Sequence, residues 1–240
     1  NLSWKISNEP YYFKKGLTWS GVGARVFGVR SYPDGMIFDS GANSYFVNND
    51  DNYYYFAGML NCGLINDIIN VINPTINTGC GVIAQLPAIV SEKDRSAVEY
   101  LVQECISLSQ KDWNSFENSW DYKRHPFVEQ AERLWDATGV AATITHYYGK
   151  HISTSCPIEL CYLLWRGECN ERFAQLKKNE EELNRIFLAI YGLEDEIEYN
   201  YFEILEQIQD GSYAKEFMDK VKSGALIPSD KTVDNFKKLF

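Results

Sequence analysis

The side chains best suited to bind a ligand lie near the start of the chain, where basic and aromatic residues alternate. Basic side chains supply phosphate contacts, and arginine can also read guanine in the major groove of DNA. This pattern predicts a DNA-contact region, although a hairpin with a solvated outer face and aromatic residues packed inward would give the same composition. The predicted contact residues are Lys14, Lys15, Trp19, Ser20, Arg25 and Arg30.

The distribution of charge favours this region over the rest of the chain. The formal net charge is −10, which argues against a protein that simply coats nucleic acid. Residues 1–90 carry five basic and six acidic side chains, whereas residues 91–240 carry 18 basic and 27 acidic ones. All five bases of the first part precede position 31, so a local positive face is expected only there.

Two patterns in the sequence could indicate a metal-dependent site. His146, His151, Cys156 and Cys161 recur every five residues, and zinc is bound by such side chains. A spacing of five turns a helix by about 140° per step, so these side chains would converge only in a loop. The second alternative is a nuclease, in which Asp121 of the segment 121–123 (Asp-Tyr-Lys) and the remote Asp34 would hold Mg²⁺ with Lys123 beside them. Ordinary packing and solvated charge pairs explain both patterns more simply.

No complete cofactor or catalytic motif is present. The segments 21–23 (Gly-Val-Gly) and 79–81 (Gly-Cys-Gly) are too short for a phosphate or cofactor loop. The segment 8–11 (Asn-Glu-Pro-Tyr) echoes the NPPY motif of adenine methyltransferases, but Glu9 replaces a proline and no glycine loop precedes it. With three histidines in the chain, no serine or cysteine nucleophile set stands out. The sequence predicts no catalytic residue, no metal site and no cofactor held by this chain.

The elements that position the basic region are predicted to be short strands followed by a bent helix. Residues 25–29 and 36–39 are predicted to pair as a hairpin across the turn residues 31–35, which contain Pro33 and Gly35. Residues 53–70 favour a helix that is broken or bent near Gly58 and Gly63 and ends at the segment 73–77. Residues 82–83 and 86–90 are predicted to be extended.

The remaining residues, 91–240, are predicted to be helical. A capping pair of Ser91 and Asp94 precedes one helix, and Pro126 suits the first turn of another that stops near Gly139. The strongest pattern predicts a helix over 159–191, stopped by Gly192. Its predicted apolar side consists of Phe173, Leu176, Leu183, Phe187 and Ile190. Further helices are expected at 201–210, at 213–223 and from Ser229.

Composition places the chain among ordinary globular proteins. The 240 residues are 45% hydrophobic and include six cysteines without a CxxC pair, which indicates reduced thiols in a cytoplasmic protein. No run of about 18 apolar residues and no signal segment occurs, so no membrane association is predicted. The chain begins at Asn1 and its first methionine is Met36, so it is expected to be part of a longer protein.

A resemblance to one protein family covers roughly residues 10–195 and is most specific in the segments 169–173 and 179–193. The other segments that carry it are 12–20, 27–30, 35–39, 41–44, 60–62, 73–77, 83–87 and 113–121. In these segments the chain resembles the PglX-type adenine-specific DNA methyltransferases of BREX phage-defence systems, which are close to single-chain type II modification enzymes.

The resemblance implies a role in DNA sequence recognition. In that family the methyltransferase domain, which uses S-adenosylmethionine, precedes this region, and the region itself is similar to the recognition domains of type I specificity subunits. The predicted fold class is α+β, with a small, mostly antiparallel recognition-like domain at 1–90 and a helical region at 91–240. The expected partner is double-stranded DNA, with other defence-system subunits as further candidates. The alternatives are a scaffold that docks partner subunits through helix 159–191, and the nuclease.

Overall fold

The computed structural model describes residues 7–23, 26–47, 52–134, 146–149 and 156–194. The chain divides into two compact units, residues 1–197 and residues 198–240. Everything described here belongs to the first unit. The helices expected at 201–210, at 213–223 and from Ser229 lie outside the described residues, as does the predicted helix stop at Gly139.

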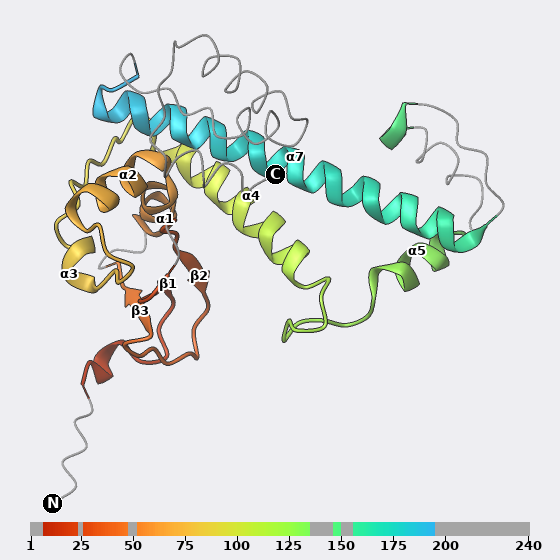
Figure 1. Ribbon diagram of the computed structural model, residues 1–240, viewed down its shortest axis with the longest axis horizontal. Coiled ribbons are helices and arrows are strands. Elements are labelled where there is room, and N and C mark those ends of the chain that lie inside the picture. The colour runs from red at the N-terminus through yellow and green to blue at the C-terminus, as the bar shows by residue number, and fades with distance from the viewer. Residues whose placement is uncertain (1–6, 24–25, 48–51, 135–145, 150–155, 195–240) are drawn as a thin grey trace, which may run out of the picture. The chain divides into compact units, whose positions relative to one another are not determined.

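Three short antiparallel strands form the sheet of this unit (Figure 1). Strand β1 (Gly16–Ser20) lies in the centre, between β2 (Arg30–Tyr32) and β3 (Ala42–Tyr45). Leu17 pairs with Ser31 on one side and with Tyr45 on the other. The rest of the described residues are largely helical, which confirms the α+β class.

The predicted hairpin of residues 25–29 and 36–39 is wrong. Residues 26–29 form no strand, because side chains of the following helices take up their backbone hydrogen bonds. The Asn61 amide accepts from the Val29 N–H at 2.9 Å and donates to the Val29 carbonyl at 3.1 Å. Asn66 accepts in the same way from the Phe27 N–H at 2.9 Å. The predicted turn does form, with Gly35 at a φ of 96°, but it follows strand β2.

The next helices show where glycine breaks the chain and where it does not. Helices α1 (Tyr53–Asn61) and α2 (Gly63–Ile72) meet at an angle of 65°, which confirms the bend near Gly63. Gly58 lies inside α1 without a break. A Cβ atom there would come within 2.8 Å of Val102 Cγ2, so Gly58 allows a neighbouring helix to approach closely.

The extended segment predicted at 82–83 is instead a short helix, α3 (Cys80–Ile83). Its first turn starts where the Val82 N–H donates to the Gly79 carbonyl at 3.0 Å, a local bond that an apolar pattern of two residues does not reveal. Residues 87–90 are irregular, and none of the described strands pairs with them. The Tyr55 hydroxyl holds them by donating to the Ile89 carbonyl at 3.1 Å.

Three further helices follow in this unit (Figure 1). They are α4 (Arg95–Trp113), α5 (Pro126–Leu134) and α7 (Pro157–Tyr191). Ser91 and Asp94 interact as expected, since the Ser91 hydroxyl donates to Asp94 Oδ2 at 2.6 Å, while α4 itself begins at Arg95. Gly192 ends α7 with a φ of 67°, as predicted for the residue after a helix.

Helix α7 organises the core by contacting α4, α5 and α2. Phe187 is completely buried and meets the ring of Tyr55 from α1 at a centroid distance of 5.6 Å. Leu183 is also buried, as predicted. The prediction for Phe173 is wrong, because this residue is 62% exposed. Helix α4 runs antiparallel to α7 and ends at Trp113, where Asp112 contacts Arg172, so the cover provided by α4 ends next to Phe173.

The core includes residues from both sides of the predicted boundary near residue 90. Helix α1 contacts α4, and α2 contacts α7. The division into a domain at 1–90 and a region at 91–240 therefore stays a prediction that rests on the change of periodicity alone.

Within the described ranges, no single helix is long and apolar enough to cross a membrane. Helices α1 and α2 reach the length and apolar composition of a membrane span only when the bent pair is counted as one segment. Tyr53, Tyr55, Leu60, Leu64 and Ile65 of this pair are buried in the packing, as expected for core helices.

A buried thiol at the α1–α2 junction should make the protein less stable in alkali. Burial raises the pKa of Cys62 from 9.0 to about 11. The unfolded chain therefore loses this proton first as the pH rises, and stability falls between about pH 9 and pH 11 by roughly 2 kcal/mol. Urea unfolding of the wild type and of Cys62→Ala at several pH values measures this loss. The exposed Cys80 supplies the control variant Cys80→Ala, and equal pH slopes for the wild type and Cys62→Ala would contradict the prediction.

Candidate nucleic-acid interface

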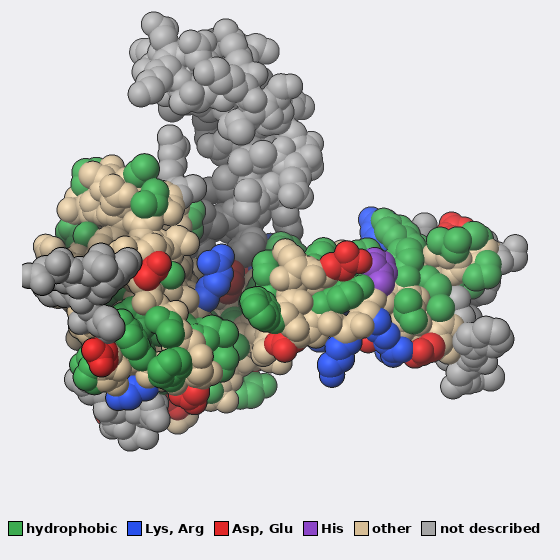
Figure 2. Space-filling view, turned by 90° about the horizontal axis from the view of Figure 1, so that it is seen from below, with side chains coloured by type: hydrophobic (Ala, Val, Ile, Leu, Met, Phe, Trp, Pro, Cys, Tyr) green, Lys and Arg blue, Asp and Glu red, His purple; other side chains and the backbone are tan. Residues whose placement is uncertain are grey.

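The two predicted contact lysines have different surroundings. Lys14 is exposed, and its ammonium lies 5.6 Å from the centroid of the Tyr11 ring. The Lys15 ammonium lies 3.8 Å from the Tyr53 ring centroid and 4.9 Å from that of Tyr54, so helix α1 holds it in a cation–π contact. The ammonium of Lys14 is therefore more accessible to a ligand than that of Lys15. Figure 2 shows hydrophobic side chains gathered over this sheet end of the molecule, with few basic ones between them.

Arg30 lies on the face of the sheet that α1 does not cover. Cross-strand partners share a face, and Arg30 is paired with Thr18, whose chain neighbours Leu17 and Trp19 are buried. The Arg30 side chain is exposed and forms no ion pair with any of the described residues. The sequence carries a signal that separates the two faces, because apolar and polar side chains alternate over residues 17–20.

Trp19 belongs to the core of this unit. It is 3% exposed, its indole N–H donates to the Thr78 carbonyl at 2.8 Å, and its ring meets that of Phe27 at 6.0 Å. A ring with so little exposed surface has little to offer a base. Ser20 is exposed at the end of β1, and Arg25 lies outside the described residues. The set of six contact residues stays a prediction.

Sequence reasoning missed the tyrosines that support this surface. Tyr53 is 2% exposed, and its hydroxyl donates to the Gly16 carbonyl and contacts the Ser31 hydroxyl, each at 2.8 Å. One side chain of α1 thus joins β1 to β2 beneath Lys15. Nothing in the spacing of the sequence links Tyr53 to residues so far away along the chain.

Five arginines of the helical part differ from Lys14 and Arg30 because acidic neighbours neutralise them. Arg185 forms an ion pair with Glu182 at 2.5 Å, and Arg172 forms one with Asp112 at 3.3 Å. Further basic residues that are paired with carboxylates are Arg95, Arg124 and Arg133. Such pairs leave less charge for an external phosphate.

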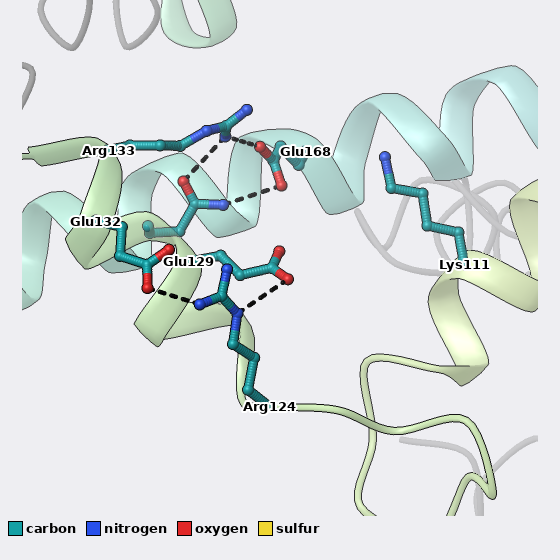
Figure 3. Close-up of a pocket in the computed structure, with 7 residues that line it drawn as sticks. Lys111, Arg124, Glu129, Glu132, Arg133 and Glu168 are labelled. Carbon is teal, nitrogen blue, oxygen red and sulfur yellow. Dashed lines mark hydrogen bonds and ion pairs between the residues drawn. The ribbon is translucent and has the colours of Figure 1, made fainter.

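A hollow of about 470 Å³ between α5, α7 and the end of α4 contains a polar network (Figure 3). Arg124 contacts Glu132 at 2.6 Å and Glu129 at 3.5 Å, while Arg133 contacts Glu168. Lys111 lies across the hollow from these pairs. Its three basic and three acidic lining residues balance, so the hollow does not favour an anionic ligand.

The metal alternatives find no support among the described residues. No group of three or more histidine, cysteine, aspartate or glutamate side chains there could hold a metal ion. Of the proposed zinc ligands, His146 contacts Glu171 at 2.8 Å, Cys161 is buried, and His151 lies outside the described residues. For the nuclease, Asp34 accepts from the Lys15 N–H at 2.8 Å, whereas Asp121 lies in the α4–α5 connection.

The described unit thus has an α+β fold with two exposed cations, Lys14 before strand β1 and Arg30 in strand β2, that form no ion pair with the described residues. None of the protein-family models matches the chain. It is 32% identical over 193 residues to the adenine-specific methyltransferase PglX of Lacticaseibacillus casei (strain Zhang), and the aligned residues make up 79% of this chain and 14% of that relative. It is also 32% identical over 126 residues to the adenine-specific methyltransferase BrxX of Escherichia coli O9:H4 (strain HS), and the aligned residues make up 52% of this chain and 10% of that relative.

The chain is therefore related to the PglX/BrxX-type adenine-specific methyltransferases, as the resemblance in its sequence implied. It spans about 14% or less of the length of these curated relatives.

Proposed function

We propose that this chain is the DNA sequence-recognition part of a longer adenine-specific DNA methyltransferase that acts in phage defence or restriction–modification. The observation that carries the proposal is the pair of exposed side chains Lys14 and Arg30, which form no ion pair among the described residues. The relatives named adenine-specific methyltransferases supply the class of activity.

The chemistry of the two cations suggests a division of labour. Lys14 is a point charge that suits a phosphate oxygen, whereas the fork of the Arg30 guanidinium can donate two parallel hydrogen bonds to a guanine edge. The excess of acidic residues in the helical part does not prevent this, because exposed charges further than about 8 Å away are screened at physiological salt. Methylation of adenine N6 would then require the rest of the methyltransferase to extrude the base from the stack.

The methyl donor S-adenosylmethionine belongs, in this proposal, to another part of the methyltransferase. The two glycine segments of this chain do not form a cofactor loop between a strand and a long helix. Gly21 and Gly23 form backbone hydrogen bonds with residues 76 and 78, and Gly79 and Gly81 flank the first residue of the four-residue helix α3. Neither glycine segment therefore supports a cofactor loop, and we expect no methyl transfer by this chain.

The salt dependence of DNA binding tests the proposal. The 240-residue chain is titrated with a pool of DNA duplexes of randomised sequence at several salt concentrations. If Lys14 and Arg30 each contact a phosphate, replacing either by alanine lowers the slope of log affinity against log salt by about 0.9. Near 0.1 M salt this corresponds to an affinity loss of roughly 5–10-fold for each variant.

Arg185→Ala is the matched control, because Arg185 is an exposed arginine that Glu182 already neutralises. Selection of bound duplexes from the pool then separates two roles for Arg30. A phosphate contact weakens binding to all sequences equally, whereas a base contact relaxes discrimination at one position by about 1–3 kcal/mol. If Lys14→Ala and Arg30→Ala remain folded with unchanged affinity and salt slope, this surface is not the DNA interface.

A further inference from the structure

The connection between α4 and α5 buries a serine and exposes large aromatic side chains. Ser119 is 8% exposed, and its hydroxyl donates to Asn114 Oδ1 at 2.7 Å and accepts from the Asp121 N–H at 3.2 Å. The next residue, Trp120, is 102% exposed. This reverses the usual arrangement, in which a folded chain shields tryptophan and leaves serine in water.

Backbone hydrogen bonds hold this arrangement through a series of tight turns. The Phe116 N–H donates to the Trp113 carbonyl at 3.2 Å, and the Ser119 N–H donates to the Phe116 carbonyl at 3.0 Å. Trp113 is 55% exposed and Phe116 is 48% exposed, so three large aromatic side chains reach solvent within eight residues. Isolated exposed apolar residues are normal, but such a concentration marks an interaction surface. In the view of Figure 1 the connection runs clear of α7.

The charges near these aromatic residues favour a protein partner over nucleic acid. Lys111 and Lys123 are exposed on either side of the turns, and the exposed acids Glu117 and Asp121 balance them. A surface without excess positive charge gains little from phosphates. Tryptophan and other aromatic side chains are, in contrast, the residues that most often supply binding energy in protein interfaces.

We propose that Trp113, Phe116 and Trp120, called here the aromatic turn, dock into an apolar pocket of the methyltransferase part of the same polypeptide. This inference rests on the proposed function, in which the chain belongs to a longer methyltransferase. The three side chains expose roughly 500 Å². That is less than the ~800 Å² per partner typical of stable complexes, so a second, separate copy of the chain would be held weakly.

A covalently attached partner does not need such a large area. Linking raises its effective concentration to the millimolar range, where a small apolar contact is sufficient. The related PglX protein supplies the reason to expect this partner, because 14% of its length corresponds to this chain. The aromatic turn would then orient the recognition surface relative to the part that transfers the methyl group.

Hydroxyl-radical footprinting of the full-length methyltransferase and of the 240-residue chain tests the docking. In the chain alone, Trp113, Phe116 and Trp120 should be oxidised rapidly. In the full-length protein their oxidation should be about tenfold slower, because docking excludes water from the pocket. Tyr100 of α4 is the internal control, since it is 67% exposed and should be oxidised equally in both proteins.

Trp120→Ala should then restore oxidation of Phe116 in the full-length protein and lower its methylation rate by roughly 10-fold or more. The same change should leave DNA affinity and the unfolding midpoint of the 240-residue chain unaltered, because the side chain is fully exposed there. Tyr100→Ala is the matched variant and should change neither oxidation nor methylation.

Four results would overturn the docking proposal. Equal oxidation in the full-length protein and in the chain would indicate an open surface, and protection of the chain alone as its concentration rises would indicate a second copy. Protection that is lost when residues 195–240 are deleted would indicate an internal cover. Protection that appears only with added duplex DNA would indicate a nucleic-acid contact. Protection in the full-length protein without DNA binding by the chain would uphold docking and contradict the proposed function.

Discussion

Replacing Trp19 by alanine should lower the free energy of unfolding by about 3–5 kcal/mol. The indole is 3% exposed, packs against Phe27 and donates a hydrogen bond to the Thr78 carbonyl. Its removal would leave a cavity beneath the sheet and a carbonyl without its donor. Because Trp19 was also a predicted DNA contact, the same variant separates a role in folding from a role in binding.

Urea unfolding followed by circular dichroism measures the stability change. Ser20→Ala is the control one residue away, where an exposed side chain should alter stability by about 0.5 kcal/mol or less. The stability loss of Trp19→Phe should lie between those of Trp19→Ala and Ser20→Ala, because phenylalanine keeps most of the ring volume and loses the N–H. If Trp19→Ala keeps wild-type stability and loses DNA affinity, the tryptophan acts at the interface and the core assignment is wrong.

Phe187→Ala should cost a similar amount, about 3–5 kcal/mol, because this ring lies where three helices meet. Phe187 of α7 is completely buried and contacts Tyr55 of α1. A Cβ atom on Gly58 would lie 3.4 Å from it, on the side where Val98 and Val102 of α4 approach. Its loss should therefore loosen α1, α4 and α7 together.

Phe173→Ala is the matched control for this prediction, since it removes a phenyl ring from the same helix at a position that is 62% exposed. Thermal and urea unfolding should show a large shift for Phe187→Ala and a change of about 0.5 kcal/mol or less for Phe173→Ala. Comparable effects of the two variants would mean that Phe173 and Phe187 are buried to a similar extent, contrary to the packing of α7.

Local sequence signals determined most helix positions. The 3.6-residue period, Pro126 and Gly192 predicted helices whose ends lie within two residues of the observed ones where the structure describes them. Gly63 marked the bend between α1 and α2, and Gly35 marked a turn. These features depend on neighbours within a few positions, so the sequence alone carries the information.

The relation to PglX/BrxX-type methyltransferases was also readable from the sequence, because it rests on runs of residues rather than on contacts. The basic and aromatic residues near the start of the chain suggested an interface, but composition could not distinguish their separate environments. Lys14, Lys15 and Trp19 belong to the same short segment and look equally suited to bind DNA.

Only the tertiary structure distinguished these three residues. Trp19 is buried with its N–H donated to the Thr78 carbonyl, and Lys15 is held over the rings of Tyr53 and Tyr54, while Lys14 is exposed. The strands were misplaced for the same reason, since the distant Asn61 and Asn66 take the hydrogen bonds that residues 27–29 would otherwise offer to a sheet. Each outcome depends on a partner more than 30 positions away along the chain, and local periodicity carries no information about such partners.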